Sequence, residues 1–413
     1  MAEGAEIWFV RHAESEANAS GVWQGQSESG LTPRGLQQVE ALLGRLAGVD
    51  FDAIVSSPLG RARETAAALG EPSIDPGFLE IDLGSWEGKS WRELAATDLS
   101  DLEALRRGAN IRFGGVGEST GELRDRVLEA IERVFGRLAT GGRAIVVTHG
   151  GVLDVLVERA FGRIGGRRLA GFPANTSITR LVRRFGQDRL LAYNDTAHLG
   201  SRPQVVVEAV EAGHPVMAII RHARTAANKD GRWQGHSDGG LDSYGHGQAA
   251  ALAAGYPALD RVVTSPLGRA RQTALQLHPE PEVLDDLAEL GFGKWEGLTA
   301  DEIRQGWPDL FESIFERGND LARGETGETW NELASRVRNG IESIKPGPGQ
   351  VTGVVTHGAA IRAYLSSLVG GDWRRAHAWD TPLNTSLTHV ILYDEGPFVV
   401  DYGTAGHLQG MGW

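Results

Sequence analysis

The feature that most constrains the fold of this chain is an internal repeat. The heptapeptide SPLGRAR at Ser57–Arg63 recurs unchanged at Ser265–Arg271. Shorter motifs recur in the same order at offsets of 208 to 210 residues, among them Arg11-His12-Ala13, Trp23-Gln24-Gly25, Trp86-Glu87-Gly88 and Val146–Gly150. A repeat of about 200 residues is too long for a solenoid and has the length of a domain. The sequence therefore predicts two homologous domains, residues 1–204 and 214–413.

Within each repeat, short apolar runs rich in β-branched residues alternate with helical patterns. The predicted strands of the first repeat are Ile7–Val10, Ala53–Val55, Ala144–Val147 and Ile178–Val182. A helix is predicted from Pro33, with Thr32 as N-cap and an apolar face of Leu36, Val39, Leu42, Leu43 and Leu46. Strands that alternate with helices favour a parallel sheet covered on both faces. The predicted fold class is α/β, with two tandem three-layer α/β/α domains, each built on a mostly parallel central sheet flanked by helices.

Composition excludes several classes of function. The chain has no Cys, which excludes disulfide frameworks, thiolate metal sites and thiol nucleophiles. Its net charge of −13 argues against a nucleic acid or an anionic membrane as the main partner. The N-terminus lacks the basic and apolar regions of a signal peptide, and no run of about 18 apolar residues occurs. We therefore expect a soluble, cytoplasmic protein that binds neither nucleic acid nor membrane.

Charged side chains follow the predicted strands at their carboxyl ends, where α/β sheets bind ligands. Arg11 and His12 directly follow the first strand, and His149 follows a later one. Arg61 lies where a strand turns into a helix, so its guanidinium begins near a helix N-terminus, a favourable place for an anion. These positions predict an anion-binding catalytic site.

Other repeated residues are less decisive. Glu80 and Glu87 recur as Glu289 and Glu296, and the residues alone do not decide which pair is catalytic. The repeated His198 and His407 are interpreted as structural, because no motif partner accompanies them. The repeated triplets Asn175–Ser177 and Asn384–Ser386 match the N-glycosylation pattern and are interpreted as turn residues.

Six motifs in order resemble the histidine phosphatase superfamily, in its phosphoglycerate-mutase-like branch. They are RHAESxxN, LTxxGxxQ, SPLxRAxxTA, ExxxGxWEG, GES and VTHG. The resemblance covers essentially the whole chain, twice. It implies a metal-independent phosphatase that acts on a small phosphorylated metabolite through a phosphohistidine, with no metal or other cofactor.

The resemblance also implies a role for each repeated residue. His12 and His222 are the phosphorylated nucleophiles, and Glu80 and Glu289 are the proton donors. The groups that hold the phosphoryl oxygens are Arg11, Arg61 and His149 in the first domain and Arg221, Arg269 and His357 in the second. Asn18 and Asn228 add hydrogen bonds to the phosphoryl group. The further substrate-binding positions are Ser15, Gln24, Gly25, Thr225, Gln234 and Gly235.

Two alternatives stay open. The first is a phosphoglycerate mutase; such mutases carry a longer insertion before the second catalytic His, and a His-Tyr-Gly where this chain has Asp82–Gly84 and Gly291–Gly293. The second is that one domain is a non-catalytic phosphate-binding or scaffold module. The second repeat has Arg224, His236 and Asp242 where the first has Glu14, Gln26 and Thr32. The segments 90–117 and 298–327, expected to cover the two sites, also differ, which favours different substrates. We expect a monomer whose domains pack as a pseudo-dimer.

Overall fold

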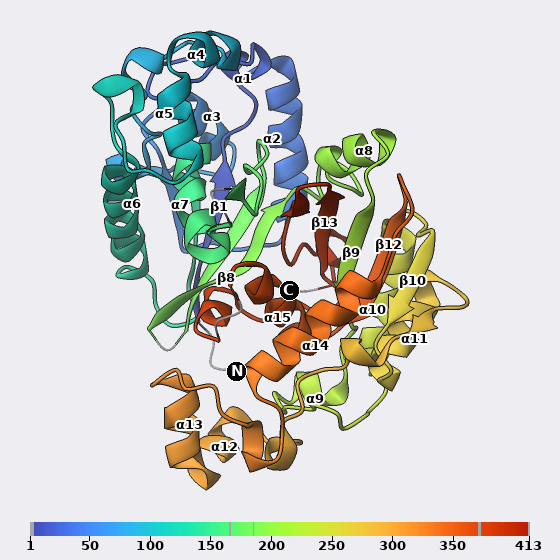
Figure 1. Cartoon of the computed structure of the whole chain (residues 1–413). Helices are drawn as coiled ribbons and strands as arrows, with labels where there is room; N and C mark the ends of the chain where they lie inside the picture. The colour runs from blue at the N-terminus through green and yellow to red at the C-terminus, as the bar shows by residue number, and fades with distance from the viewer. Residues whose placement is uncertain (1–3, 165–166, 185, 371–372, 412–413) are drawn as a thin grey trace. The chain divides into compact units, whose positions relative to one another are not determined.

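The computed structural model describes residues 4–164, 167–184, 186–370 and 373–411, and Figure 1 shows its ribbon. The chain divides into two compact units, residues 2–199 and 200–413. Helix α8 (Gln204–Glu211) begins the second unit, and its Val206 and Ala209 are buried in the core of that unit.

A six-stranded sheet forms the centre of the first unit, in the order β3-β2-β4-β1-β7-β8. Its strands are β1 (Ala5–Arg11), β2 (Ala53–Ser56), β3 (Ser73–Ile74), β4 (Arg143–Thr148), β7 (Ile178–Arg184) and β8 (Gln187–Asp195). The first four are parallel, whereas β7 and β8 run antiparallel to their neighbours. The prediction of a mostly parallel sheet is confirmed, and all four predicted strands of this unit are present.

Helices cover both faces of this sheet. Successive residues of β1 point to opposite faces, and on each face they pack against a different pair of helices. Ile7 and Phe9 pack in one core with residues of α6 (Thr120–Phe135) and α7 (Gly150–Phe161). Trp8 and Val10 pack in another core with residues of α2 (Pro33–Leu46) and α3 (Gly60–Ala67). The predicted three-layer arrangement is therefore confirmed.

Helix α2 begins as predicted but buries a narrower face than the sequence suggested. The Thr32 side chain caps it by accepting from Gly35 N, and Pro33 is its first residue. Val39, Leu42 and Leu46 are buried, but Leu36 is 59% exposed and Leu43 is 38% exposed, so the predicted apolar face is only partly buried. Leu36 follows the buried Gly35, and Leu43 follows the buried Leu42. Each step of one residue rotates the side chain by about 100° around the helix axis.

The second unit repeats this architecture. Its sheet has the order β11-β10-β12-β9-β13-β14. The strands are β9 (Val216–Arg221), β10 (Arg261–Thr264), β11 (Glu282–Val283), β12 (Val351–Thr356), β13 (Leu387–Tyr393) and β14 (Gly396–Val399). The helices that correspond to α2, α3, α6 and α7 are α10 (Ser243–Gly255), α11 (Gly268–Leu277), α14 (Trp330–Ser343) and α15 (Gly358–Leu368).

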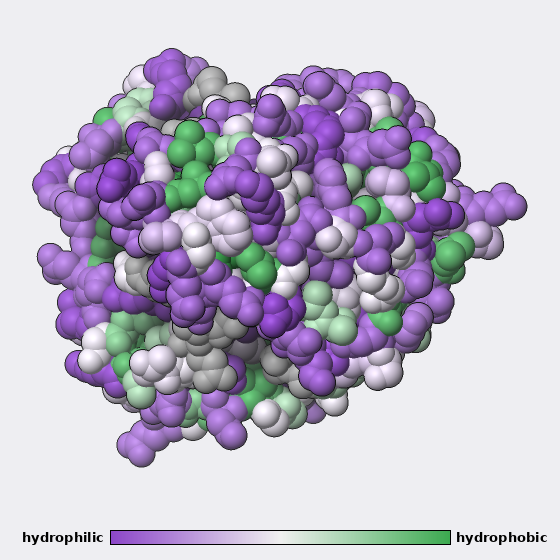
Figure 2. Space-filling view, turned by 90° about the horizontal axis from the view of Figure 1, so that it is seen from below, coloured by the Kyte–Doolittle hydropathy of each residue, from purple (hydrophilic) through white to green (hydrophobic). Residues whose placement is uncertain are grey.

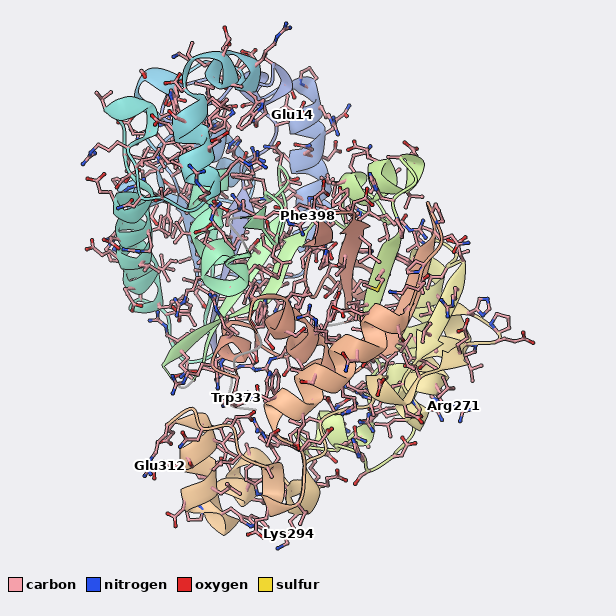
Figure 3. The ribbon with its side chains drawn as sticks, in the orientation of Figure 1. Glu14, Arg271, Lys294, Glu312, Trp373 and Phe398 are labelled. Atoms are coloured by element: carbon pink, nitrogen blue, oxygen red, sulfur yellow. The ribbon has the colours of Figure 1, made fainter. Side chains whose placement is uncertain are left out.

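The segments expected to cover the two sites have the same arrangement of short helices but different side chains. Each holds two short helices, α4 (Trp91–Thr97) and α5 (Leu99–Arg106) in the first unit and α12 (Ala300–Gly306) and α13 (Pro308–Phe315) in the second. Figure 3 labels Glu312, on α13, and Lys294, in the 3-10 helix Gly293–Trp295 that precedes α12. In the second unit, Phe315 packs against Trp233, with ring centroids 5.8 Å apart.

The visible surface is predominantly hydrophilic. Figure 2 shows one face on which hydrophilic residues dominate and hydrophobic ones are scattered. Among the described residues, every helix is too short or too polar to cross a membrane.

Candidate active site

The topology brings the predicted catalytic residues of each unit to one edge of its sheet. Strand β1 lies between β4 and β7, and β4 lies beside β2, so the carboxyl ends of β1, β2 and β4 are neighbours. Arg11 ends β1, His149 caps α7 directly after β4, and Arg61 lies in the first turn of α3 after β2. The ring centroids of His12 and His149 are 5.1 Å apart, and those of His222 and His357 are 5.0 Å apart.

Hydrogen bonds fix the tautomer of His12. Its Nδ1 lies 2.7 Å from the carbonyl oxygen of Ala13, which can only accept, so Nδ1 carries the proton. Arg61 Nε, which can only donate, lies 3.3 Å from His12 Nε2. Nε2 therefore presents a lone pair beside a guanidinium. His222 has the same contact from its Nδ1 to Ala223 O, at 2.7 Å.

The surroundings keep both first-unit histidines neutral. Burial and the charges of Arg11 and Arg61 hold the pKa of His12 well below its usual value. Burial is also the largest cause that lowers the pKa of His149, and the same two guanidiniums add to it. A neutral imidazole is the form that can act as a nucleophile.

The arginines are held by backbone carbonyls and keep further donors for an anion. Arg11 Nη1 donates to Pro173 O over 2.7 Å, and Arg221 Nη1 donates to Pro382 O over 2.5 Å. The Nε of each is buried and has no hydrogen-bond partner within the described ranges. A buried donor without a partner costs about 1–3 kcal/mol, and an anion at the site would relieve this cost.

The Glu80 side chain contacts the first turn of α7 at Gly151, two residues after His149. Its carboxylate accepts from Gly151 N over 3.1 Å and from Ile81 N over 2.9 Å. Burial raises the pKa of Glu80, although these two N–H groups and the charges of Arg61 and Arg11 oppose the rise. A raised pKa suits a carboxyl group that must hold a proton near neutral pH.

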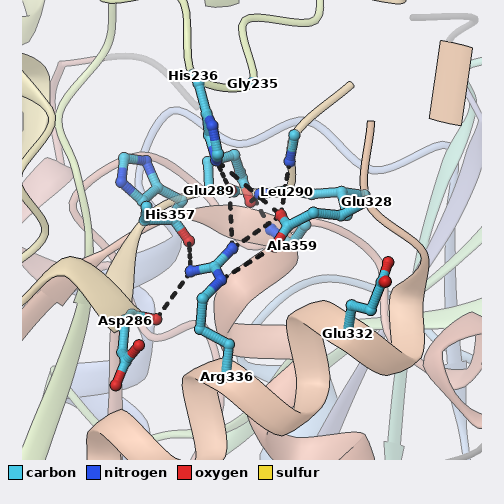
Figure 4. A network of polar contacts seen from close by, with 12 residues as sticks. Gly235, His236, Asp286, Glu289, Leu290, Glu328, Glu332, Arg336, His357 and Ala359 are labelled. Atoms are coloured by element: carbon cyan, nitrogen blue, oxygen red, sulfur yellow. Dashed lines mark hydrogen bonds and ion pairs between the residues drawn. The ribbon is translucent and has the colours of Figure 1, made fainter. Parts of the chain in front are cut away.

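In the second unit, Glu289 occupies the same position within a larger polar network (Figure 4). Its carboxylate accepts from Leu290 N over 2.8 Å and from Ala359 N over 3.3 Å. Its backbone oxygen lies 2.8 Å from His236 Nε2. Gln26 Nε2 donates to the matching oxygen of Glu80 over 3.2 Å, so the exchange of Gln26 for His236 preserves this contact.

Glu87, the other candidate acid, holds a loop instead. Its two oxygens accept from Gly25 N, Gln26 N and the Ser27 hydroxyl. Glu296 holds the equivalent loop through His236 N and the backbone and hydroxyl of Ser237. These contacts occupy the carboxylates of Glu87 and Glu296, and the assignment of Glu80 and Glu289 as the acids stays a prediction.

The loop held by Glu87 also positions Arg61, which donates to the carbonyl oxygens of Gly25 and Ser27 over 2.7 and 2.9 Å. A Cβ at Gly25 would overlap the Ile81 carbonyl oxygen and the Glu87 carboxylate. We therefore expect Gly25→Ala to destabilise the protein by about 1–3 kcal/mol and to lower the activity of the first site, measured by thermal unfolding and phosphate release.

Gly30→Ala is the matched control for that variant, because a Cβ at Gly30 meets nothing within 4 Å. Its melting temperature should stay close to that of the unchanged protein. Equal melting temperatures for both variants would contradict the account of the loop.

The remaining predicted substrate positions contact one another. Ser15 Oγ lies 3.2 Å from Gln24 Oε1, and Ser15 caps α1 (Glu16–Ala19) together with Asn18. Thr225, Asn228 and Gln234 repeat this arrangement at α9 (Ala226–Lys229), while the carbonyl of Gly235 accepts from Arg269. These groups support the loop around the site, and their contact with substrate stays a prediction.

Sequence reasoning missed two side chains that hold this site. Asn175 Nδ2 donates to His12 O over 2.8 Å and to Asn18 Oδ1 over 3.0 Å, and Asn384 makes the same pair of contacts in the second unit. Ser57 Oγ lies 2.7 Å from His149 Nε2. The available signal in the sequence was that Asn175 and Ser57 recur in the second repeat, as Asn384 and Ser265.

The turn that carries Asn175 is strained and braced. Thr176 has a φ of 56°, a left-handed conformation that is rare for a β-branched residue. Its hydroxyl donates to Asn175 O and also lies 3.0 Å from His198 Nε2. Burial lowers the pKa of His198 to about 4, so its ring is neutral at pH 7. These contacts agree with the structural reading of His198.

Arg224 and Asp242, two residues at which the second repeat differs from the first, contact each other and lie outside the catalytic contacts. Thr32 Oγ1 donates to the Glu14 carboxylate over 2.8 Å (Glu14 is labelled in Figure 3), and Arg224 Nε donates to Asp242 over 2.9 Å. Thr32 and Asp242 both cap the following helix. The exchange therefore leaves the catalytic residues unchanged.

The fold and the site define an α/β protein whose sheet edge groups two histidines, two arginines and a carboxyl group, side chains that are suited to an anion. In the described part of the chain, no three side chains of His, Asp or Glu are grouped so as to hold a metal ion. The model of the histidine phosphatase superfamily (branch 1) matches residues 7–196 and 217–405. The chain belongs to this superfamily and is a tandem two-domain phosphatase within it.

The chain is similar to proteins of about half its length. It is 34% identical to a metal-independent phosphoserine phosphatase of Arabidopsis thaliana over 48% of the chain and 85% of that protein. It is 32% identical to a probable phosphoglycerate mutase of Erwinia tasmaniensis over 43% of the chain and 84% of that protein. The chain is also similar to the solved structure of Bacillus stearothermophilus YhfR. The match covers 47% of the chain and 99% of that structure, with 28% identity and a TM-score of 0.43.

Proposed function

We propose that the protein is a metal-independent phosphohydrolase that cleaves monoesters of small phosphorylated metabolites at two separate sites. The observation that carries the proposal is the His12 imidazole, which directs an unprotonated Nε2 at a guanidinium donor 3.3 Å away. A phosphate that takes over this contact from His12, held by Arg61 and Arg11, would place its phosphorus in front of the lone pair.

In the first step, His12 Nε2 attacks phosphorus, the bond from phosphorus to the ester oxygen breaks, and Glu80 gives its proton to the leaving oxygen. The guanidiniums stabilise the charge on the transferring group, for which positioning and electrostatics do most of the work. Ser57 Oγ accepts from Leu59 N and can donate its proton to His149 Nε2, which leaves His149 Nδ1–H to bond the phosphoryl group.

In the second step, water attacks the phosphorus of the phosphohistidine. The Glu80 carboxylate takes a proton from this water, the phosphorus–nitrogen bond breaks, and His12 recovers its lone pair. Division into two steps replaces one difficult displacement by two easier ones. His222, Arg269, Arg221, Glu289 and His357 perform the same steps in the second unit.

Phosphatase activity is favoured over mutase activity. A mutase must return the phosphoryl group to the substrate rather than to water. The segments over the two sites are short, and each holds one pair of short α-helices, α4–α5 or α12–α13, and one 3-10 turn. Relatives carry both kinds of name. Release of inorganic phosphate from 4-nitrophenyl phosphate, phosphoserine and 3-phosphoglycerate tests the proposal, and isomerisation of phosphoglycerate without release would contradict it.

Activity should survive metal chelation. The positive charge that a divalent ion would supply to the transferring group is already present as two guanidiniums in each unit. We expect phosphate release to be unchanged after dialysis against EDTA and to be inhibited by vanadate, measured with 4-nitrophenyl phosphate. Loss of activity in EDTA that a divalent ion restores would overturn this part of the proposal.

A further inference from the structure

The segment 171–175 holds one side chain at a fixed place on the rim of the first site. Tyr193 OH donates to the carbonyl of Gly171 over 2.5 Å, and Arg11 Nη1 donates to the carbonyl of Pro173 over 2.7 Å. Phe172 lies between these two bonded carbonyls. The backbone beside Phe172 is therefore tied to the guanidinium of Arg11, whose charge helps to lower the pKa of His12.

The Phe172 ring is exposed but held. It is 61% exposed, and its Cδ1 would lie 3.6 Å from a Cβ placed on Gly150, the residue after His149. The guanidinium of Arg168 lies over the ring, 4.4 Å from its centroid, and donates to Asp154 over 2.9 Å. An exposed aromatic ring braced by a cation offers a flat apolar surface to a ligand.

The position of Glu80 indicates which part of a substrate meets this ring. Glu80 bonds Gly151 N, one residue beyond the glycine that Phe172 approaches. The acid must face the leaving oxygen of the ester, so the leaving group departs from the phosphate along the N-terminus of α7. Phe172, which approaches Gly150, lies at the same end of that helix.

The second unit keeps this backbone but changes the side chain. The two matching bonds are Tyr402 OH to Asp380 O and Arg221 Nη1 to Pro382 O. Thr381 takes the place of Phe172, and its Cγ2 would lie 2.6 Å from a Cβ on Gly358. Arg168 and Asp154 also correspond to His377 and Arg362, so the brace is absent at those positions.

Resting on the proposed function, we propose that Phe172 and Thr381 are specificity-determining residues that give the two sites different leaving-group preferences. The first site takes phosphate monoesters whose alcohol carries an aromatic or other flat apolar group. The second site takes esters of small polar alcohols. The catalytic residues are the same in both, so the difference lies in the alcohol portion of the substrate.

The test uses the full chain with one site silenced at a time. His222→Ala leaves the first site and His12→Ala leaves the second. The substrates are 2-phenylethyl phosphate and 2-hydroxyethyl phosphate, whose primary alcohols have similar pKa values, so that the ratio of their kcat/KM values reports leaving-group binding. Phe172→Thr should lower this ratio about tenfold at the first site, since the contact of one aromatic ring is lost. Thr381→Phe should raise it at the second site.

Ile74→Thr is the matched control, because Ile74 is also an exposed apolar side chain but lies on the edge strand β3. A ratio that changes less than about twofold in Phe172→Thr, or as much in the control, would overturn the inference while the proposed function stands. Absence of turnover of both esters by both silenced chains would overturn the proposed function and the inference with it.

Discussion

His12→Ala and His222→Ala should each leave phosphatase activity with its own substrate profile, and only the double variant should lose turnover. Each unit holds its own copy of the residues that the proposed mechanism uses, at its own sheet edge, so the proposal needs no group from the other unit. Removal of a covalent nucleophile costs on the order of 10⁴-fold or more in kcat. The measurement is kcat/KM for the two single variants and the double variant over a panel of phosphate esters.

His246→Ala is the control for these variants, because His246 is an exposed residue of α10 outside the catalytic contacts. The competing picture is a single working site beside a phosphate-binding or scaffold module. If one single variant abolishes turnover across the whole panel and the other changes nothing, the protein has a single working site and the hypothesis of two independent sites is wrong.

Glu80→Gln, made in the His222→Ala chain, should lower activity on alkyl esters by about 10²–10⁴-fold and on 4-nitrophenyl phosphate by about tenfold or less. An alkoxide needs a proton to leave, whereas a nitrophenolate leaves without one. Burial raises the pKa of Glu80, so it keeps this proton to a higher pH than an ordinary carboxyl group. Alkyl-ester activity of the parent chain should therefore fall as the pH rises through this pKa.

Glu87→Gln is the matched control, because Glu87 supports the loop that holds Arg61. It should lower activity on alkyl and aryl esters by similar factors. Equal losses on both classes in Glu80→Gln, with unequal losses in Glu87→Gln, would assign the acid to Glu87 instead.

Much of the fold was predictable because the same pattern appears twice. The repeated motifs predicted two units, and the alternation of apolar strands with helical patterns predicted the α/β fold. The structure places the predicted site residues at the strand ends, as expected. What sequence could not show is which side chains hold others. Asn175 looked like a turn residue, and its bond to His12 O depends on a contact between residues 163 positions apart.

Substitutions read one at a time were also misleading. Arg224 and Asp242 looked like two separate departures of the second repeat, but they are one ion pair that replaces one hydrogen-bonded pair. The exposure of Leu36 and Leu43 also could not be read from the sequence. An apolar spacing predicts a helix, while the row of residues that faces the sheet depends on how the helix is rotated against its neighbours.

The most direct test of the central claim is rapid acid-free quenching of the protein during turnover of a ³²P-labelled phosphate ester. The account predicts label that is stable to alkali, labile to acid, and located by peptide mapping on His12 and His222. The His12→Ala chain should carry it on His222 alone, and the His222→Ala chain on His12 alone. Label on Ser or Asp, or an unlabelled protein while phosphate is being released, would contradict the phosphohistidine mechanism.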